Sequence, residues 1–109
     1  MLKNVYILAA RRTPFGSFMG QLSGFSTGKL GAMAIEAALK DSGVKGDQVE
    51  QVYMGCVLAA NLGQAPARQA AIFAGLPKSV PCTTINKVCG SGMKAVMLAA
   101  QSIETGECE

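Results

Sequence analysis

The chain has 109 residues, of which half are apolar and 16% are charged, with a formal net charge of +3. This length allows one domain at most, and the apolar content excludes a disordered chain. The basic residues are scattered with few aromatic residues between them, so no nucleic-acid-binding surface is indicated. The low charged fraction predicts that another part of the protein, or another subunit, covers much of the surface.

The cysteines and the apolar runs exclude further classes. The four cysteines lie at positions 56, 82, 89 and 108, no Cys-X-X-Cys pair occurs, and the chain has no histidine. We therefore expect free thiols and no metal site. No apolar run is long enough to cross a bilayer. No presequence precedes the first apolar run, so we expect a cytoplasmic location, with a peroxisomal signal at a later C-terminus as the alternative.

The first part of the chain predicts a strand, a loop and a helix. The apolar run Val5–Ala10 is typical of a strand buried on both faces. Residues 15–26 are rich in glycine and serine and predict a structured loop. A helix is expected over residues 28–42, with Thr27 as its cap and Gly43 after its end. The residues expected on its inner face are Leu30, Met33, Ala34, Ala37 and Ala38.

The rest of the chain predicts two more strands and two more helices. The strands are expected at Val52–Leu58 and Cys82–Asn86. A helix opened by residues 63–66, with a proline near its first position, and running through residue 73, follows the first of them. The last helix is expected to begin at Gly90 and to end before Gly106. The residues expected on its inner face are Met93, Val96, Met97 and Ala100.

The order β-α-β-α-β-α predicts an α/β domain with a mainly parallel sheet and helices packed on its faces. Three strands with no further neighbour would leave an unpaired sheet edge and an uncovered face. We therefore expect residues 1–109 to form an incomplete N-terminal part of a layered α/β/α domain, whose C-terminal half lies outside this sequence.

The segment from Asn86 to Ala95, NKVCGSGMKA, carries the chemistry. In it, a strand ends, Cys89 follows, and glycine and serine residues open a helix. The N–H groups and the dipole at a helix start favour the reactive thiolate and stabilise an oxyanion. Gly90 and Gly92 leave room for a bulky substrate. The pattern suits covalent acyl transfer through Cys89. The alternative from the residues alone is a buried structural cysteine, since no histidine is present to act as its base.

NKVCGSGMKA also resembles the nucleophile motif of the thiolase family. The resemblance extends in order and with matching spacing over essentially the whole chain. It includes the segments AARRTPFG (residues 9–16), YMGCVL (residues 53–58) and GQAPARQA (residues 63–70). The likeness is greatest to the short-chain branch of acetyl-CoA C-acetyltransferases, and it implies a thiolase-like fold of which residues 1–109 are the N-terminal part.

The resemblance implies a C-acyltransferase that condenses two acetyl-CoA molecules to acetoacetyl-CoA, or cleaves a 3-ketoacyl-CoA, through an acyl thioester on Cys89. It implies coenzyme A thioesters as substrates with no bound cofactor, and a homodimer or homotetramer. The histidine and the second cysteine that thiolases use lie in a C-terminal half. Cys56, Cys82 and Cys108 match no motif of the family, so none of them is given a catalytic role.

Two other hypotheses compete with this one. A ketoacyl synthase shares a nucleophilic cysteine at a helix start, but NKVCGSGMKA is more similar to thiolases. A non-catalytic module that only pairs with other subunits is the alternative from a different class. Two further residues are interpreted conservatively: Ser91 is expected to bond the local backbone, and Arg68 to be solvated or salt-bridged.

Overall fold

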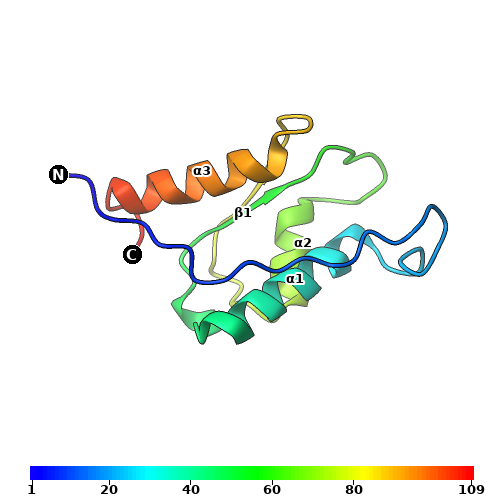
Figure 1. The fold of residues 1–109 in the computed structure, drawn as a ribbon, viewed down its shortest axis with the longest axis horizontal. Coiled ribbons are helices and arrows are strands. Elements are labelled where there is room, and N and C mark those ends of the chain that lie inside the picture. The colour runs from blue at the N-terminus through cyan, green and yellow to red at the C-terminus, as the bar shows by residue number, and fades with distance from the viewer.

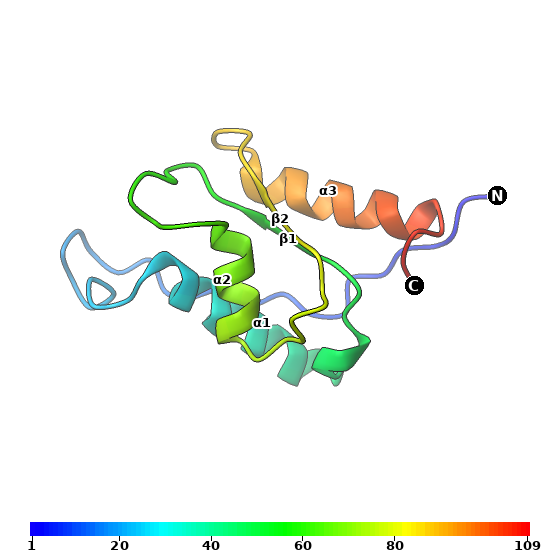
Figure 2. The same ribbon diagram turned by 180° about the vertical axis from the view of Figure 1, so that it is seen from behind.

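The computed structural model describes all of residues 1–109 and arranges them in three layers (Figure 1). A sheet of two strands, β1 (Val52–Gly55) and β2 (Cys82–Ile85), lies in the middle. Helix α3 (Ser91–Glu104) covers one face of this sheet. Helices α1 (Thr27–Ser42) and α2 (Pro66–Phe73) pack together on the other side, which the reverse view shows clearly (Figure 2).

The two strands pair in parallel, from Val52 opposite Cys82 to Gly55 opposite Ile85. This confirms the predicted α/β class and the parallel pairing. Both strands are shorter than the runs predicted for them. After Gly55, the N–H of Cys56 still donates to the carbonyl of Ile85 at 2.9 Å. Beyond that bond a side chain joins the two segments, since the amide of Asn86 donates to the Val57 carbonyl at 3.3 Å.

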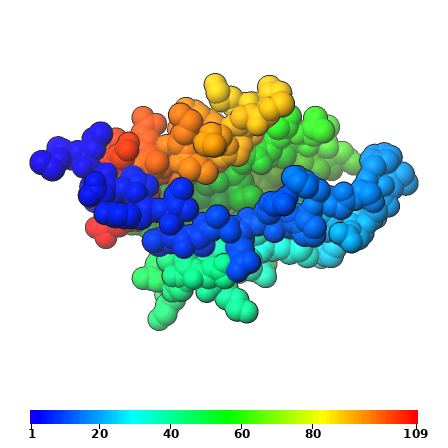
Figure 3. All heavy atoms as spheres, viewed as in Figure 1, coloured from blue at the N-terminus to red at the C-terminus, as the bar shows by residue number.

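The predicted first strand does not form. Residues 5–10 are extended and cross the molecule between α3 and α1 (Figure 3), but they make no strand pairing. Tyr6, Ile7 and Leu8 are 74%, 78% and 66% exposed. A strand needs a neighbouring backbone to bond, and here a mostly apolar cavity of about 370 Å³ lies between residues 7–9 and the side chains of α1 and β1. The prediction of a third strand was therefore wrong for this chain.

Two contacts hold the two ends of this extended segment. The N–H of Lys3 donates to the carbonyl of Glu104, at the end of α3, at 3.2 Å. The guanidinium of Arg11 pairs with the carboxylate of Asp41, near the end of α1. The segment therefore joins α3 to α1 across the open side of the sheet.

The local signals placed the helix ends well. The hydroxyl of Ser26, one residue before the predicted cap Thr27, accepts the N–H of Lys29 at 3.3 Å and so caps α1. Gly43 ends this helix with a φ of 72°, which glycine adopts without strain. The short helical turn Gly46–Gln48 that follows was not predicted.

Helix α2 begins with a proline, as predicted, and is tied to the sheet. The N–H of Ala67 donates to the hydroxyl of Thr84 in β2 at 3.0 Å. The guanidinium of Arg68 donates to the carbonyls of Val80 at 3.0 Å and Lys78 at 2.7 Å. The expectation of a solvated or salt-bridged Arg68 was wrong, because this side chain fixes the loop that leads into β2.

The buried faces of the long helices differ in part from those predicted. Helix α3 buries Ser91, Ala95 and Ser102, while Met93, Val96 and Met97 are all more than half exposed. The sequence pattern did not separate these faces because both carry apolar residues. The small-residue face meets the sheet since it allows the closer approach of helix and strand.

On α1, Gly28 and Ala32 are buried, whereas Met33 from the predicted inner face is exposed. The other four residues predicted on that face are half-buried, namely Leu30, Ala34, Ala37 and Ala38. Small residues again make the contact, because α1 and α2 pack closely: a Cβ added at Gly31 would lie 2.8 Å from the Cβ of Ala70. The core cluster that results lies between β1 and α2. It consists of Val52, Ala71, Leu76 and Val80. No helix is both long enough and apolar enough to cross a membrane.

Candidate active site

The turn from β2 into α3 presents Cys89 at the start of a helix. The N–H of Gly90 donates to the carbonyl of Lys87 at 3.0 Å, and the N–H of Ser91 donates to the carbonyl of Val88 at 3.1 Å. Helix α3 then begins at Ser91. The thiol of Cys89 is free and exposed. Cys89 is therefore not buried within this chain.

Two side chains bond the backbone of this turn. The hydroxyl of Ser91, a residue only 4% exposed, accepts the N–H of Lys87 at 2.9 Å and donates to the carbonyl of Val88 at 2.6 Å. This confirms that Ser91 bonds the local backbone. The side-chain oxygen of Asn86 accepts the N–H of Val88 at 3.0 Å. Asparagine side chains often bond the backbone two residues further along the chain. The hydrogen bond between Asn86 and Val88 could therefore have been predicted from the sequence.

Gly55 lets the start of α3 lie directly on β1. A Cβ added at this glycine would meet the backbone nitrogen of Gly92 and the backbone carbon of Ser91, both at 2.6 Å. Atoms essentially never come that close without a shift of the backbone. A glycine inside a strand often marks such an approach. Gly55 therefore fixes how far the turn that carries Cys89 stands from the sheet, which the sequence analysis missed.

The other three cysteines are partly buried. The thiol of Cys82 donates to the carbonyl of Val80 at 3.4 Å. Partial burial, with the nearby carboxylates of Glu50 and Glu107, raises the pKa of the Cys108 thiol above its ordinary value. No three side chains of histidine, cysteine, aspartate or glutamate come together as metal ligands. Cys89 is thus the one fully accessible thiol.

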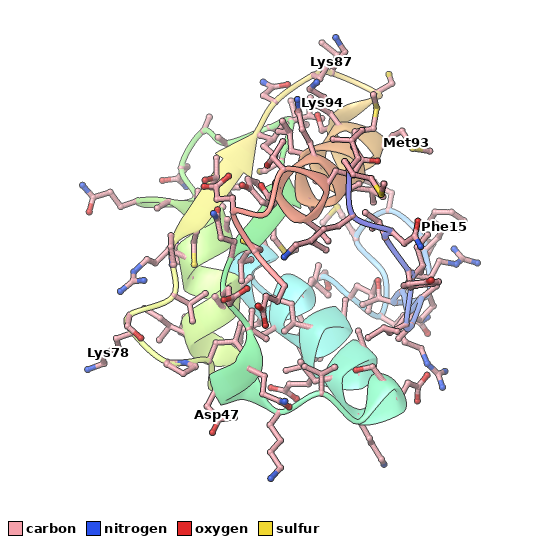
Figure 4. All side chains as sticks on the ribbon, turned by 90° about the vertical axis from the view of Figure 1, so that its left-hand side faces the viewer. Phe15, Asp47, Lys78, Lys87, Met93 and Lys94 are labelled. Atoms are coloured by element: carbon pink, nitrogen blue, oxygen red, sulfur yellow. The ribbon has the colours of Figure 1, made fainter.

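Two lysines stand beside the turn. Lys87 belongs to the turn and Lys94 to the first turns of α3, and both extend from the same end of the molecule, next to the exposed Met93 (Figure 4). This end therefore carries two positive charges, with an apolar side chain beside them.

Comparison with known protein families identifies the family of this chain. A family profile described as "Thiolase, N-terminal domain" matches residues 5–109. The chain belongs to the thiolase family. Among curated thiolase relatives, acetyl-CoA acetyltransferase 2 of Arabidopsis thaliana is 60% identical over 104 residues, which are 95% of this chain and 26% of the relative. The mitochondrial acetyl-CoA acetyltransferase of Homo sapiens is 55% identical over 105 residues, or 96% of this chain and 25% of the relative.

A solved thiolase has the same fold. The crystal structure of the thiolase Acat5 from Ascaris suum, in complex with coenzyme A, matches with a TM-score of 0.90 at 45% sequence identity. The match covers 95% of this chain and 27% of that structure. The chain therefore spans about a quarter of the length of the thiolases that it matches.

Proposed function

We propose that this thiolase domain supplies the nucleophile of an acetyl-CoA C-acyltransferase, and that the nucleophile is Cys89. The observation that carries the proposal is the exposed Cys89 thiol at the first turn of α3, inside a domain of the thiolase family. The names of the curated relatives support acetyl-CoA as the substrate. The positive charge of Lys87 and Lys94 suits an anionic coenzyme A thioester.

The reaction proceeds in two steps. A base takes the proton of the Cys89 thiol, and the resulting thiolate attacks the thioester carbonyl of an acyl-CoA. The carbonyl re-forms as the bond to coenzyme A breaks, and the protonated base gives the proton to the leaving coenzyme A. A second base then takes a proton from the methyl group of a second acetyl-CoA, and this proton later returns to the Cys89 sulfur. The resulting carbanion attacks the acyl group on Cys89, which releases the 3-ketoacyl-CoA and regenerates the thiolate. The reverse sequence cleaves a 3-ketoacyl-CoA.

The turn can stabilise the charge that develops in the first step. The N–H groups of Gly90 and Ser91 are bonded within the turn, whereas the N–H of Cys89 has no acceptor in the chain. The Cys89 N–H lies next to the reacting sulfur, so it is the donor we assign to the oxyanion.

The chain has no histidine, and a thiolate nucleophile is normally activated by a base. We propose that the catalytic unit is a longer protein whose C-terminal half contributes a histidine and a second cysteine, as in thiolases. We also propose that this protein is a cytoplasmic homodimer or homotetramer. Cell fractionation and light scattering of the purified protein test these two properties.

A hybrid enzyme tests the proposed function directly. The chain replaces the aligned N-terminal quarter of acetyl-CoA acetyltransferase 2 of Arabidopsis thaliana, with which it shares 60% identity over 104 residues. We expect the hybrid to cleave acetoacetyl-CoA when coenzyme A is added. Replacing Cys89 by alanine should abolish turnover, while the Cys82→Ala control, in the part-buried strand before the turn, should stay active.

One observation favours the non-catalytic assembly module as a second candidate. Met93, Val96 and Met97 form an exposed apolar row along α3, and such a row is typical of a surface that another polypeptide covers. A folded hybrid that self-associates but never turns over acetoacetyl-CoA would support this module. Turnover that depends on Cys89 would exclude it.

A further inference from the structure

The turn before Cys89 contains a strained residue. Val88 has a φ of 47°, in the left-handed region. Three other residues besides glycine have positive φ, namely Met19, Asn61 and Ala65, but Val88 is the only β-branched one. A β-branched residue there is a true outlier whose backbone is strained. Such a conformation persists only where the surroundings hold it in place.

Asn86 and Ser91 hold the backbone of Val88 from both sides. The Asn86 side-chain oxygen accepts the Val88 N–H at 3.0 Å, and the Ser91 hydroxyl donates to the Val88 carbonyl at 2.6 Å. Ser91 also fixes the preceding residue, since its hydroxyl accepts the N–H of Lys87 at 2.9 Å.

The side chains of Asn86 and Ser91 also make contacts outside the turn. The amide nitrogen of Asn86 donates to the carbonyl of Val57, in the loop after β1. Ser91 is buried against β1, where a Cβ on Gly55 would lie 2.9 Å from the Cβ of Ser91. The turn is therefore tied to the sheet by two side chains, one on each side of Cys89 in the sequence.

We propose that Asn86 and Ser91 are positioning residues for Cys89. They hold Val88 in its left-handed conformation, and this conformation sets the direction in which the next residue presents its thiol and its N–H. The inference rests on the proposed function of Cys89. It explains why the backbone from Asn86 to Ser91 is held in one conformation. Ser91 acts through the backbone and is not a second nucleophile, because its hydroxyl is buried and already bonded.

The test uses the hybrid enzyme with Ser91→Ala, Asn86→Ala and Asn86→Asp variants. The matched control is Ser102→Ala, because Ser102 is also buried on α3 but bonds Tyr53 and not the turn. Acetylation of Cys89 is followed in a single turnover with acetyl-CoA, and kcat and KM are measured with acetoacetyl-CoA. We expect Ser91→Ala and Asn86→Ala to lower kcat about 10- to 100-fold at nearly unchanged KM, since misaligned reacting groups lose rates of this order.

Two further comparisons separate positioning from a general loss of stability. Asn86→Asp keeps the oxygen that accepts the Val88 N–H, so it should be more active than Asn86→Ala. Glycine adopts a positive φ without strain. In a Val88→Gly background the backbone therefore depends less on the hydrogen bonds from Asn86 and Ser91 to keep this conformation. The loss caused by Ser91→Ala should then shrink to about three-fold or less.

The outcomes are distinct. If the parent hybrid acetylates Cys89 and both alanine variants do so at the parent rate, the positioning role is overturned and the proposed function stands. If the parent hybrid is never acetylated on Cys89, the proposed function fails. Hydrogen exchange of the peptide containing residues 86–91 then decides the positioning role. Faster exchange in the two alanine variants than in Ser102→Ala would support the role of Asn86 and Ser91 in holding the turn. Equal exchange would overturn it. If Ser91→Ala does not fold, Asn86→Ala and Asn86→Asp give the same comparison.

Discussion

Replacing Gly55 by alanine should damage both the stability and the rate of the hybrid enzyme. The added Cβ would lie 2.6 Å from backbone atoms of Ser91 and Gly92. Atoms in contact stand about 3.5–4.0 Å apart, so the start of α3 must retreat from β1 by about 1 Å. Overpacking of this kind costs about 1–3 kcal/mol of unfolding free energy. A displacement of about 1 Å at a catalytic group costs about 100-fold in rate.

Two other glycines provide the controls for this experiment. An added Cβ at Gly31 would clash with Ala70 at 2.8 Å, between α1 and α2 and away from the nucleophile turn. Gly31→Ala should therefore lower the unfolding free energy and leave kcat of the folded protein close to that of the parent. Gly24 has no atom within 4 Å of an added Cβ, so Gly24→Ala should change neither quantity.

Denaturant unfolding and steady-state kinetics of the three variants measure the two effects separately. We expect a loss of stability in Gly55→Ala and Gly31→Ala, and a loss of kcat in Gly55→Ala alone. If Gly55→Ala kept both the unfolding free energy and the kcat of the parent, the argument that this glycine sets the position of Cys89 would be refuted.

Three further predictions concern reactivity, pH and the isolated chain. Iodoacetamide should label the exposed Cys89 before Cys108, whose thiol has a raised pKa; peptide mass spectrometry showing the reverse order would contradict this. The hydrogen bond from Arg11 lowers the pKa of Asp41, so this pairing stabilises the fold above the ordinary carboxyl pKa and is lost as the pH falls through the lowered value. A carboxyl NMR titration should show this low midpoint, and Arg11→Gln should return it to the ordinary range. The isolated 109-residue chain should be poorly soluble or melt without a cooperative transition, because only 11 of its residues are buried; a sharp calorimetric transition would disprove this.

The sequence predicted those parts of the fold that depend on local chemistry. Ser26 and Thr27, Gly43 and Pro66 are residues whose own backbone preferences or side-chain bonds begin or end a helix, so helix ends were placed to within about one residue. The position of Cys89 at the start of α3 followed from the same signals, because glycine and serine residues mark the change from strand to helix.

Features that depend on a distant partner could not be predicted in this way. Residues 5–10 have the composition of a strand, but pairing requires a neighbouring backbone, and this chain places none beside them. The buried side of α3 depends on the approach that Gly55 allows, so the larger Met93 and Met97 were wrongly assigned to it. The positive φ of Val88 runs against the preference of valine, so only the structure reveals it.

The most direct test of the account is to identify the residue that carries the acyl group. The hybrid enzyme is mixed with acetyl-CoA, quenched with acid, digested and analysed by mass spectrometry. We predict one added acetyl group on the peptide that contains Cys89, and none on the corresponding peptide of Cys89→Ala, which should also lack turnover. An active hybrid whose acetyl group is found on another residue, or a Cys89→Ala variant that still turns over acetoacetyl-CoA, would contradict the assignment of Cys89 as the nucleophile.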